Sequence, residues 1–302
     1  MSSASDAPAS PPFVTTVGDI NEVRSRDPQR ISTLLASRSR RSLFGADGKL
    51  MIVACDHPAR GALGAGGNPT AMANRTELLE RLLTALCRPG VDGLLATADI
   101  AEDLLLLGAL EDKLVFTSMN RGGLQGASFE MDDRNTGYDV QGTIESGFEG
   151  AKMLLRLDLS DPGTVATLQQ CGRAVTELNR ARLIAMVEPF ISSRSGGKVV
   201  NRLSPDAVIT SVHIAQGLGA SSAYTWLKLP VVHEMERVMD ATTLPTLLLG
   251  GDPDGAADET YATWQAALKL PGVRGLVVGR TMLYPADDDV AKAVDTAVSL
   301  VR

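Results

Sequence analysis

The chain has 302 residues, of which 44% are hydrophobic and 22% are charged, and its formal net charge is −7 at pH 7. This length suits a single α/β barrel, which takes about 250 residues. The composition excludes a disordered protein, and no apolar run reaches the roughly 20 residues that cross a bilayer. The acidic balance argues against a nucleic-acid partner, although it is compatible with a small local anion pocket.

The amino-terminal segment differs from the rest of the chain. Residues 1–18 are rich in Ser, Ala and Pro and have neither a basic n-region nor an apolar h-region, so we expect a flexible tail rather than a secretory signal. Apolar residues between Ile20 and Ser37 have a helix-like spacing that Pro28 interrupts. We therefore predict a helical extension over residues 19–49, ahead of the main domain.

Neither the cysteines nor the histidines have the spacing of a metal site. The three cysteines are odd in number and lie beside apolar residues, so we expect free buried thiols in a reducing cytoplasm; they are Cys55, Cys87 and Cys171. His57 follows Asp56, but the three histidines show no HxH or HExxH spacing. We expect no catalytic metal and no cofactor.

Short apolar runs alternate with longer amphipathic segments over residues 50–302, as repeated βα units require. The runs are apolar on both faces, which fits parallel strands covered by helices. The predicted strands are Leu50–Cys55, Gly93–Thr97, Leu114–Ser118, Ala151–Leu157, Leu183–Val187, Ala223–Leu229, Thr246–Leu249 and Gly275–Val278.

Helix signals lie between these runs, and capping residues or proline mark several helix starts. These signals are the segment Asn74–Leu86, the starts Asp161-Pro162 and Ser204-Pro205, and a closing helix over Asp289–Val301. Eight strands, their crossovers and a closing helix predict a (β/α)8 TIM barrel as one domain. A doubly wound open sheet is the alternative, and the absence of a GxGxxG fingerprint after the first strand disfavours it.

Charged side chains that interrupt apolar strands are candidates for chemistry, because catalytic groups of a barrel come from the carboxyl ends of its strands. Two of the seven lysines, Lys152 and Lys228, fall in predicted strands. A buried lysine must be paired or lose its proton, and a neutral amine is what Schiff-base chemistry with a carbonyl needs. The alternative is that a lysine only reaches the barrel rim with its stem buried.

Two carboxylates have matching positions. Asp56 follows the first predicted strand and Glu188 follows the fifth, so both face the same end of the barrel. Together with the two lysines they predict a pocket in which a carboxyl group is poised for proton transfer. The alternative is a buried ion-pair network without turnover.

Glycines follow the seventh and eighth strands, where barrels commonly bind phosphate. Gly250 and Gly251 would let backbone N–H groups approach an anion, and Gly279 precedes Arg280, whose guanidinium would add a charged contact. The alternative is that Gly250 and Gly251 only turn the chain. The loops at residues 119–123 and 192–197 either contact a ligand or face water.

These residues resemble the class I Schiff-base aldolases related to tagatose 1,6-bisphosphate aldolase, sulfofructose 1-phosphate aldolase and the archaeal-type fructose bisphosphate aldolases. The similarity covers roughly residues 50–285. In that group an Asp closes the first strand, a Lys lies in the fourth, a Glu closes the fifth and the Schiff-base Lys precedes a hydrophobic residue and Pro in the sixth. The matching residues are Asp56, Lys152, Glu188 and Lys228-Leu229-Pro230, and the phosphate-binding glycine and arginine residues match Gly250-Gly251 and Gly279-Arg280.

The resemblance implies a lyase that cleaves a phosphorylated ketose or keto acid by retro-aldol chemistry. Lys228 would attack the ketone, and Lys152 would keep that amine neutral by like-charge repulsion and orient a substrate hydroxyl. Glu188 would transfer protons, and Asp56 would position the substrate hydroxyls and the iminium. The sequence departs from the group at Asp56-His57-Pro58 and in a longer loop after the third strand, so the sugar-recognition end is expected to differ.

The chain also resembles an actinobacterial deoxyribose-phosphate aldolase-like group associated with inositol breakdown. This implies 2-deoxy-5-keto-gluconate 6-phosphate as the substrate, cleaved to dihydroxyacetone phosphate and malonate semialdehyde. We expect a small-molecule sugar phosphate as partner, no nucleic acid or membrane, and a homo-oligomer. The alternatives are a phosphate-binding barrel isomerase or synthase in which Glu188 is a simple base without a covalent intermediate, and a non-catalytic sugar-phosphate sensor.

Overall fold

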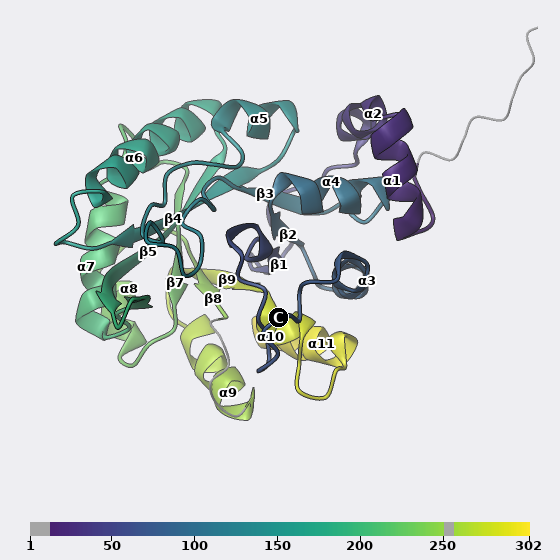
Figure 1. The fold of residues 1–302 in the computed structure, drawn as a ribbon. Helices are drawn as coiled ribbons and strands as arrows, with labels where there is room; N and C mark the ends of the chain where they lie inside the picture. The colour runs from purple at the N-terminus through teal and green to yellow at the C-terminus, as the bar shows by residue number, and fades with distance from the viewer. Residues whose placement is uncertain (1–12, 251–256) are drawn as a thin grey trace, which may run out of the picture.

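The chain folds into the predicted TIM barrel (Figure 1). The computed structural model describes residues 13–250 and 257–302. Eight parallel strands close into a ring in the order β1-β2-β3-β4-β5-β7-β8-β9, with β9 pairing back to β1, and β6 pairs antiparallel with the end of β5. The strands are β1 Leu50–Cys55, β2 Gly93–Ala96, β3 Leu114–Ser118, β4 Gly150–Leu157, β5 Ile184–Ser195, β6 Lys198–Asn201, β7 Thr225–Pro230, β8 Thr246–Leu249 and β9 Val273–Val278.

Helices cover the outside of the ring, and two more precede it. Ser204 caps its helix as predicted, and Asn74 and Asp289 cap theirs, because each side chain accepts a hydrogen bond from a backbone N–H of the first turn. Within the described residues no helix is both long and apolar enough to cross a membrane. The helices are α1 Val17–Arg26, α2 Gln29–Ser37, η1 Pro58–Arg60, α3 Arg75–Leu86, α4 Ala98–Leu106, α5 Val140–Glu145, α6 Thr164–Ala181, α7 Pro205–Gln216, α8 Met235–Asp240, α9 Ala257–Leu268, α10 Arg280–Leu283 and α11 Val290–Val301.

One predicted helix start was wrong. The helix expected from Pro162 begins at Thr164. The carboxylate of Asp161 accepts a hydrogen bond from the backbone N–H of Gly163 at 2.8 Å, which closes a turn ahead of the helix. The hydroxyl of Thr164 donates to the carbonyl of Asp158 at 2.9 Å, so the first helical turn is anchored back to β4 rather than capped by Asp161.

One expectation that was left open can now be described, and one needs correction. The polar stretch at residues 192–197, for which contact with a ligand and exposure to water were both open, continues β5 to Ser195 and then pairs with β6 in an antiparallel hairpin. Cys87 is exposed at the end of α3, where its thiol donates to the carbonyl of Thr84 at 3.2 Å, whereas the other two cysteines are free and buried as predicted.

The strands place alternate side chains in two apolar layers. Along β1, Leu50, Ile52 and Ala54 belong to the cluster inside the barrel, whereas Met51 and Val53 pack in the larger cluster between strands and helices. This alternation follows from the period of two in a strand. A residue two positions beyond the last inward-facing residue of a strand therefore places its side chain at the carboxyl end of the barrel interior.

The amino-terminal helices pack beside α4 (Figure 1), where Arg24 forms ion pairs with Glu102 and Asp103 at 2.9 and 2.8 Å. The following segment reaches the amino-terminal end of the barrel. There Leu43 packs on the inner cluster, and the ring of Phe44 stacks on the ring of Trp226 with a centroid distance of 5.7 Å. This segment therefore covers the end of the barrel opposite to the predicted site.

Candidate active site

A cavity of about 650 Å³ opens at the carboxyl end of the barrel. This volume suits a ligand of the size of a sugar phosphate. Its described lining includes residues from the carboxyl ends of six strands, namely Ala54, Leu154, Glu188, Lys228, Leu249 and Val277. The cavity thus lies where enzymes with this fold carry out their chemistry.

The strand period aims four charged side chains at this end of the barrel interior. Asp56 follows Ala54 of the inner cluster, Glu188 follows Met186 by two residues, and Lys228 follows Trp226 in the same way, while Lys152 lies on β4. Asp56 and Lys152 are fully buried, and Lys228 and Glu188 are 4% and 7% exposed. The predicted quartet is therefore one layer of the barrel interior, directly above the apolar core.

The quartet forms a continuous chain of opposite charges. The Nζ atom of Lys228 donates to Oε1 of Glu188 at 2.7 Å. The Nζ atom of Lys152 lies 3.3 Å from Oε2 of Glu188 and 2.7 Å from Oδ2 of Asp56. Glu188 therefore lies between the two lysines, with a hydrogen bond to Lys228 and an ion pair to Lys152.

Arg121 and Ser118 join this chain; the sequence pattern indicated the loop that contains Arg121 but gave no role to Ser118. The guanidinium of Arg121 pairs with Asp56, and the hydroxyl of Ser118 donates to Oδ2 of Asp56 at 2.8 Å. The Nε–H of Arg121 in turn donates to the Ser118 hydroxyl at 3.2 Å. Arg121 belongs to the loop at residues 119–123, so that loop lines the cavity.

The four charges shift one another's protonation. Burial raises the pKa of Asp56, but the charges of Arg121 and Lys152 outweigh it and hold the pKa well below its usual range. Burial raises the pKa of Glu188 as well, yet Lys228 and Lys152 lower it to about 2. Burial, reinforced by Arg121, lowers the pKa of Lys152. Both acids are therefore carboxylates at neutral pH.

Three buried polar atoms of the quartet have no hydrogen-bond partner within the described part of the chain. They are Oδ1 of Asp56, Oε2 of Glu188 and Nζ of Lys152, which lies beside two carboxylates without hydrogen-bond geometry to either. Buried polar atoms are nearly always satisfied in a network that serves stability alone. Of these residues only Glu188 is part of the described lining of the cavity, whereas Asp56 and Lys152 are fully buried behind it. The unpartnered Oε2 atom of Glu188 beside the cavity favours a functional site over the ion-pair alternative.

His57 also lines the cavity, and its Nδ1 atom lies 3.6 Å from Oδ1 of Asp56. Burial lowers the pKa of His57 to about 3 despite the opposite effect of Asp56, so the imidazole is neutral at pH 7. Over residues 13–250 and 257–302, no three His, Cys, Asp or Glu side chains lie close enough together to hold a metal ion.

Of the predicted phosphate residues, Gly250, Gly279 and Arg280 line the same cavity, and Gly251 lies outside the described residues. A Cβ atom at Gly279 would overlap the carbonyl of Ala54, because β9 ends against β1. Tight packing therefore requires this glycine whether or not an anion binds. The charged contact to an anion would come from Arg280.

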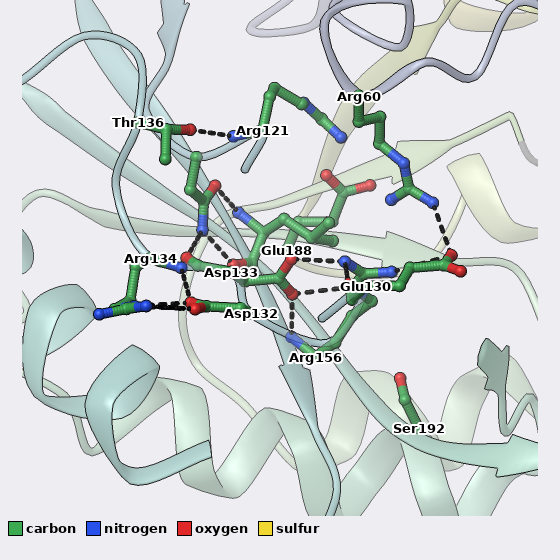
Figure 2. A network of polar contacts seen from close by, with 12 residues as sticks. Arg60, Arg121, Glu130, Asp132, Asp133, Arg134, Thr136, Arg156, Glu188 and Ser192 are labelled. Atoms are coloured by element: carbon green, nitrogen blue, oxygen red, sulfur yellow. Dashed lines mark hydrogen bonds and ion pairs between the residues drawn. The ribbon is translucent and has the colours of Figure 1, made fainter. Parts of the chain in front are cut away.

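A second polar cluster lines the cavity beyond the quartet (Figure 2). Arg156 on β4 donates two hydrogen bonds to Asp133, from Nε at 2.8 Å and from its terminal nitrogen at 2.6 Å. Glu130 lies on the same segment as Asp133, and Arg60 reaches it from η1. The criterion that singled out Lys152, a charge within an apolar strand, applies equally to Arg156, four positions along the same strand.

A family model described as Cgl0159-like matches residues 48–298. The chain belongs to the Cgl0159-like family. The crystal structure of Cgl0159 from Corynebacterium glutamicum (Brevibacterium flavum) is similar, with 60% sequence identity and a TM-score of 0.92 over 94% of this chain and 96% of that one. No curated protein matches the chain.

Class I aldolases share the barrel at much lower identity. A Schiff base-forming fructose-1,6-bisphosphate aldolase is 20% identical, with a TM-score of 0.65 over 90% of this chain and 100% of that one. An archaeal fructose-1,6-bisphosphate aldolase, with its catalytic Lys bound to the carbinolamine intermediate of the substrate, is 19% identical, with a TM-score of 0.65 over 90% and 99%. The Cgl0159-like chain therefore has the fold of the class I aldolases.

Proposed function

We propose that this Cgl0159-like protein is a class I aldolase that cleaves a phosphorylated ketose or keto acid through an imine on Lys228. The observation that carries the proposal is the 2.7 Å contact between Nζ of Lys228 and Oε1 of Glu188 at the wall of the cavity. A nucleophilic amine needs a neighbouring group that takes its proton. Glu188 is in hydrogen-bond contact with that amine, and the charge of Lys152, whose Nζ atom lies 3.3 Å from the other oxygen of Glu188, would help to keep the amine neutral.

Imine formation uses Glu188 in both directions. The carboxylate takes a proton from the Lys228 ammonium, and the freed nitrogen lone pair adds to the ketone carbon to give a carbinolamine. Glu188 then returns a proton to the carbinolamine hydroxyl, which leaves as water, and the nitrogen lone pair forms the C=N bond of the iminium. Asp56 and Lys152 are fully buried beside this carboxylate and are not part of the described cavity lining, so they would act on the substrate through Glu188.

Cleavage then uses the iminium as the electron sink. Glu188 removes the proton of the hydroxyl on the carbon β to the iminium, the C–C bond breaks, and its electron pair moves through the C=N bond onto nitrogen. An aldehyde leaves and an enamine stays on Lys228. Protonation of the enamine carbon and hydrolysis of the imine release the second product, and no step needs a metal or a cofactor.

The proposed substrate is 2-deoxy-5-keto-gluconate 6-phosphate, and its cleavage gives dihydroxyacetone phosphate and malonate semialdehyde. Its phosphate adjoins the ketone, so an anion site at Gly250, Gly279 and Arg280 would bring the ketone to the same cavity as Lys228. An isomerase or synthase that used Glu188 as a simple base would leave both buried lysines without a role, as would a non-catalytic sensor.

The test is borohydride reduction of the protein in the presence of dihydroxyacetone phosphate, followed by peptide mass spectrometry. We expect the reduced ligand on the peptide that contains Lys228, because only an imine is trapped in this way. An adduct on Lys152 would reverse the roles of the two lysines. Absence of any adduct would instead favour the isomerase.

The phosphate assignment makes a separate prediction. Arg280→Ala should weaken the binding of phosphorylated substrates by about 1.5–3 kcal/mol, the usual value of a charged hydrogen bond, and leave the binding of unphosphorylated analogues nearly unchanged. Because the phosphate helps to position the ketone against Lys228, kcat should fall together with affinity. Steady-state kinetics on both kinds of substrate measure this, and equal losses on both would place the phosphate elsewhere.

A further inference from the structure

The cluster around Arg156 lies across the cavity from the predicted phosphate residues. In a ring of eight strands, β4 is opposite β9, and β3 is opposite β8. Gly250 follows β8 and Gly279 follows β9, whereas Arg156 lies on β4 and Glu130 lies in the segment after β3. The cavity therefore has two polar sides that face each other across the barrel.

Arg60 is the least satisfied charge on this second side (Figure 2). It lies in η1 after β1, the strand that pairs with β9, and its side chain, which is 18% exposed, lines the cavity and extends to Glu130. Its terminal nitrogen is 3.5 Å from Oε1 of Glu130, which is an ion pair without a hydrogen bond. Its buried Nε–H has no hydrogen-bond partner among the residues that the structure describes.

The acids near Arg60 are already engaged. Asp133 accepts two hydrogen bonds from Arg156. The Oε2 atom of Glu130 accepts a hydrogen bond from the backbone N–H of Gly126 at 2.8 Å, and its Oε1 atom is also 3.7 Å from Arg156. Arg60 therefore forms a long ion pair with the Glu130 carboxylate, which also faces Arg156. Arg156 in addition pairs with Asp133.

The described lining of the cavity carries more positive than negative charge. Its described lining holds five basic side chains and two acidic ones, although the chain carries a net charge of −7. Burial, followed by the charges of Arg156 and Arg121, lowers the pKa of Arg60 to about 10. A buried guanidinium in surroundings short of negative charge is stabilised when an anion binds.

We infer that Arg60 binds a second anionic group of the ligand, a carboxylate or a phosphate at the end of the molecule remote from the phosphate near Arg280. The substrate class is then a phosphorylated ketose derivative with a negative group at each end, and this reading as a substrate rests on the proposed function. A guanidinium donates paired hydrogen bonds to either group. Two separate anion anchors in one cavity would fix which carbon meets Lys228.

Calorimetric binding to the full chain tests this with three probes that lack a ketone and so cannot form an imine. 6-Phosphogluconate carries a carboxylate opposite its phosphate, mannitol 1,6-bisphosphate carries a second phosphate, and glucitol 6-phosphate has a neutral hydroxyl there. We expect at least one of the doubly anionic probes to bind about 10- to 100-fold more tightly than glucitol 6-phosphate. The tighter of the two identifies the preferred group.

Arg60→Gln should abolish that preference and change the affinity for glucitol 6-phosphate by less than about twofold. Arg60→Lys, which keeps the charge without the planar donor pair, should retain part of the preference and serves if the glutamine variant does not fold. The matched control is Arg134→Gln, because Arg134 is an exposed arginine of the same segment as Glu130 that pairs with Asp132 at 2.5 Å (Figure 2), and it should keep the full preference.

Absence of a preference in the wild-type chain would overturn the inference, as would an equal loss for all three probes in both Arg60 variants. The outcome is separable from that of the proposed function. A preference that depends on Arg60, without borohydride trapping on Lys228, would leave the anion site standing and remove the aldolase mechanism. Borohydride trapping on Lys228 without such a preference would leave the aldolase mechanism standing and remove the anion site.

Discussion

Lys228→Met is expected to abolish aldol cleavage, with a fall in kcat of at least about 10⁴-fold. Methionine keeps an unbranched apolar side chain in the barrel layer but has no nitrogen to form the imine, so the reaction loses both its nucleophile and its electron sink. The same variant should show no reduced adduct after borohydride treatment with dihydroxyacetone phosphate. The measurements are initial rates of cleavage and intact-protein mass.

Lys113→Met is the matched control for this variant. Lys113 is half-buried and precedes β3 at the amino-terminal end of the barrel, where its Nζ donates to the carbonyl of Val91 at 2.7 Å. The control should form the reduced adduct and cleave the substrate as the wild type does. A Lys228→Met protein that melts at a temperature close to the wild type and still cleaves within about tenfold of its rate would rule out the imine on this residue.

Glu188→Gln should lower kcat by about 10²- to 10⁴-fold, the usual contribution of a positioned acid–base group. The amide keeps the shape and a hydrogen-bonding oxygen beside Lys228 but cannot take up its proton. Imine formation should therefore slow, which borohydride quenching at increasing times measures. Binding of glucitol 6-phosphate should stay within about twofold, because the variant leaves the proposed phosphate residues Gly250, Gly279 and Arg280 unchanged.

Glu145→Gln is the control for the acid–base variant, since Glu145 is an exposed carboxylate on α5 outside the cavity. It should trap and cleave as the wild type does. If Glu188→Gln forms the trapped adduct at the wild-type rate, the proton of Lys228 goes to another group, and Asp56 is the other carboxylate of the quartet. An unchanged affinity for the phosphate probe shows that the fold of the cavity has survived.

The sequence alone was sufficient to predict the barrel and to locate the four charged residues at its centre. Parallel strands covered by helices are apolar on both faces, so the eight runs stand out from the amphipathic helices between them. Within such runs a buried charge is costly, which makes Lys152 and Lys228 visible without any structural information. The period of two then predicts that Asp56 and Glu188 face the same end.

Only the tertiary structure decided what surrounds the quartet. Arg60, Arg121 and Glu130 lie in segments after strands, where no periodic pattern shows whether a polar residue faces water or the cavity. The pairing of Arg121 with Asp56 joins residues 65 positions apart, and that of Arg60 with Glu130 joins two separate loops. Strand period is a local property of the chain, whereas the electrostatics of the cavity depend on which loops closure of the barrel brings together.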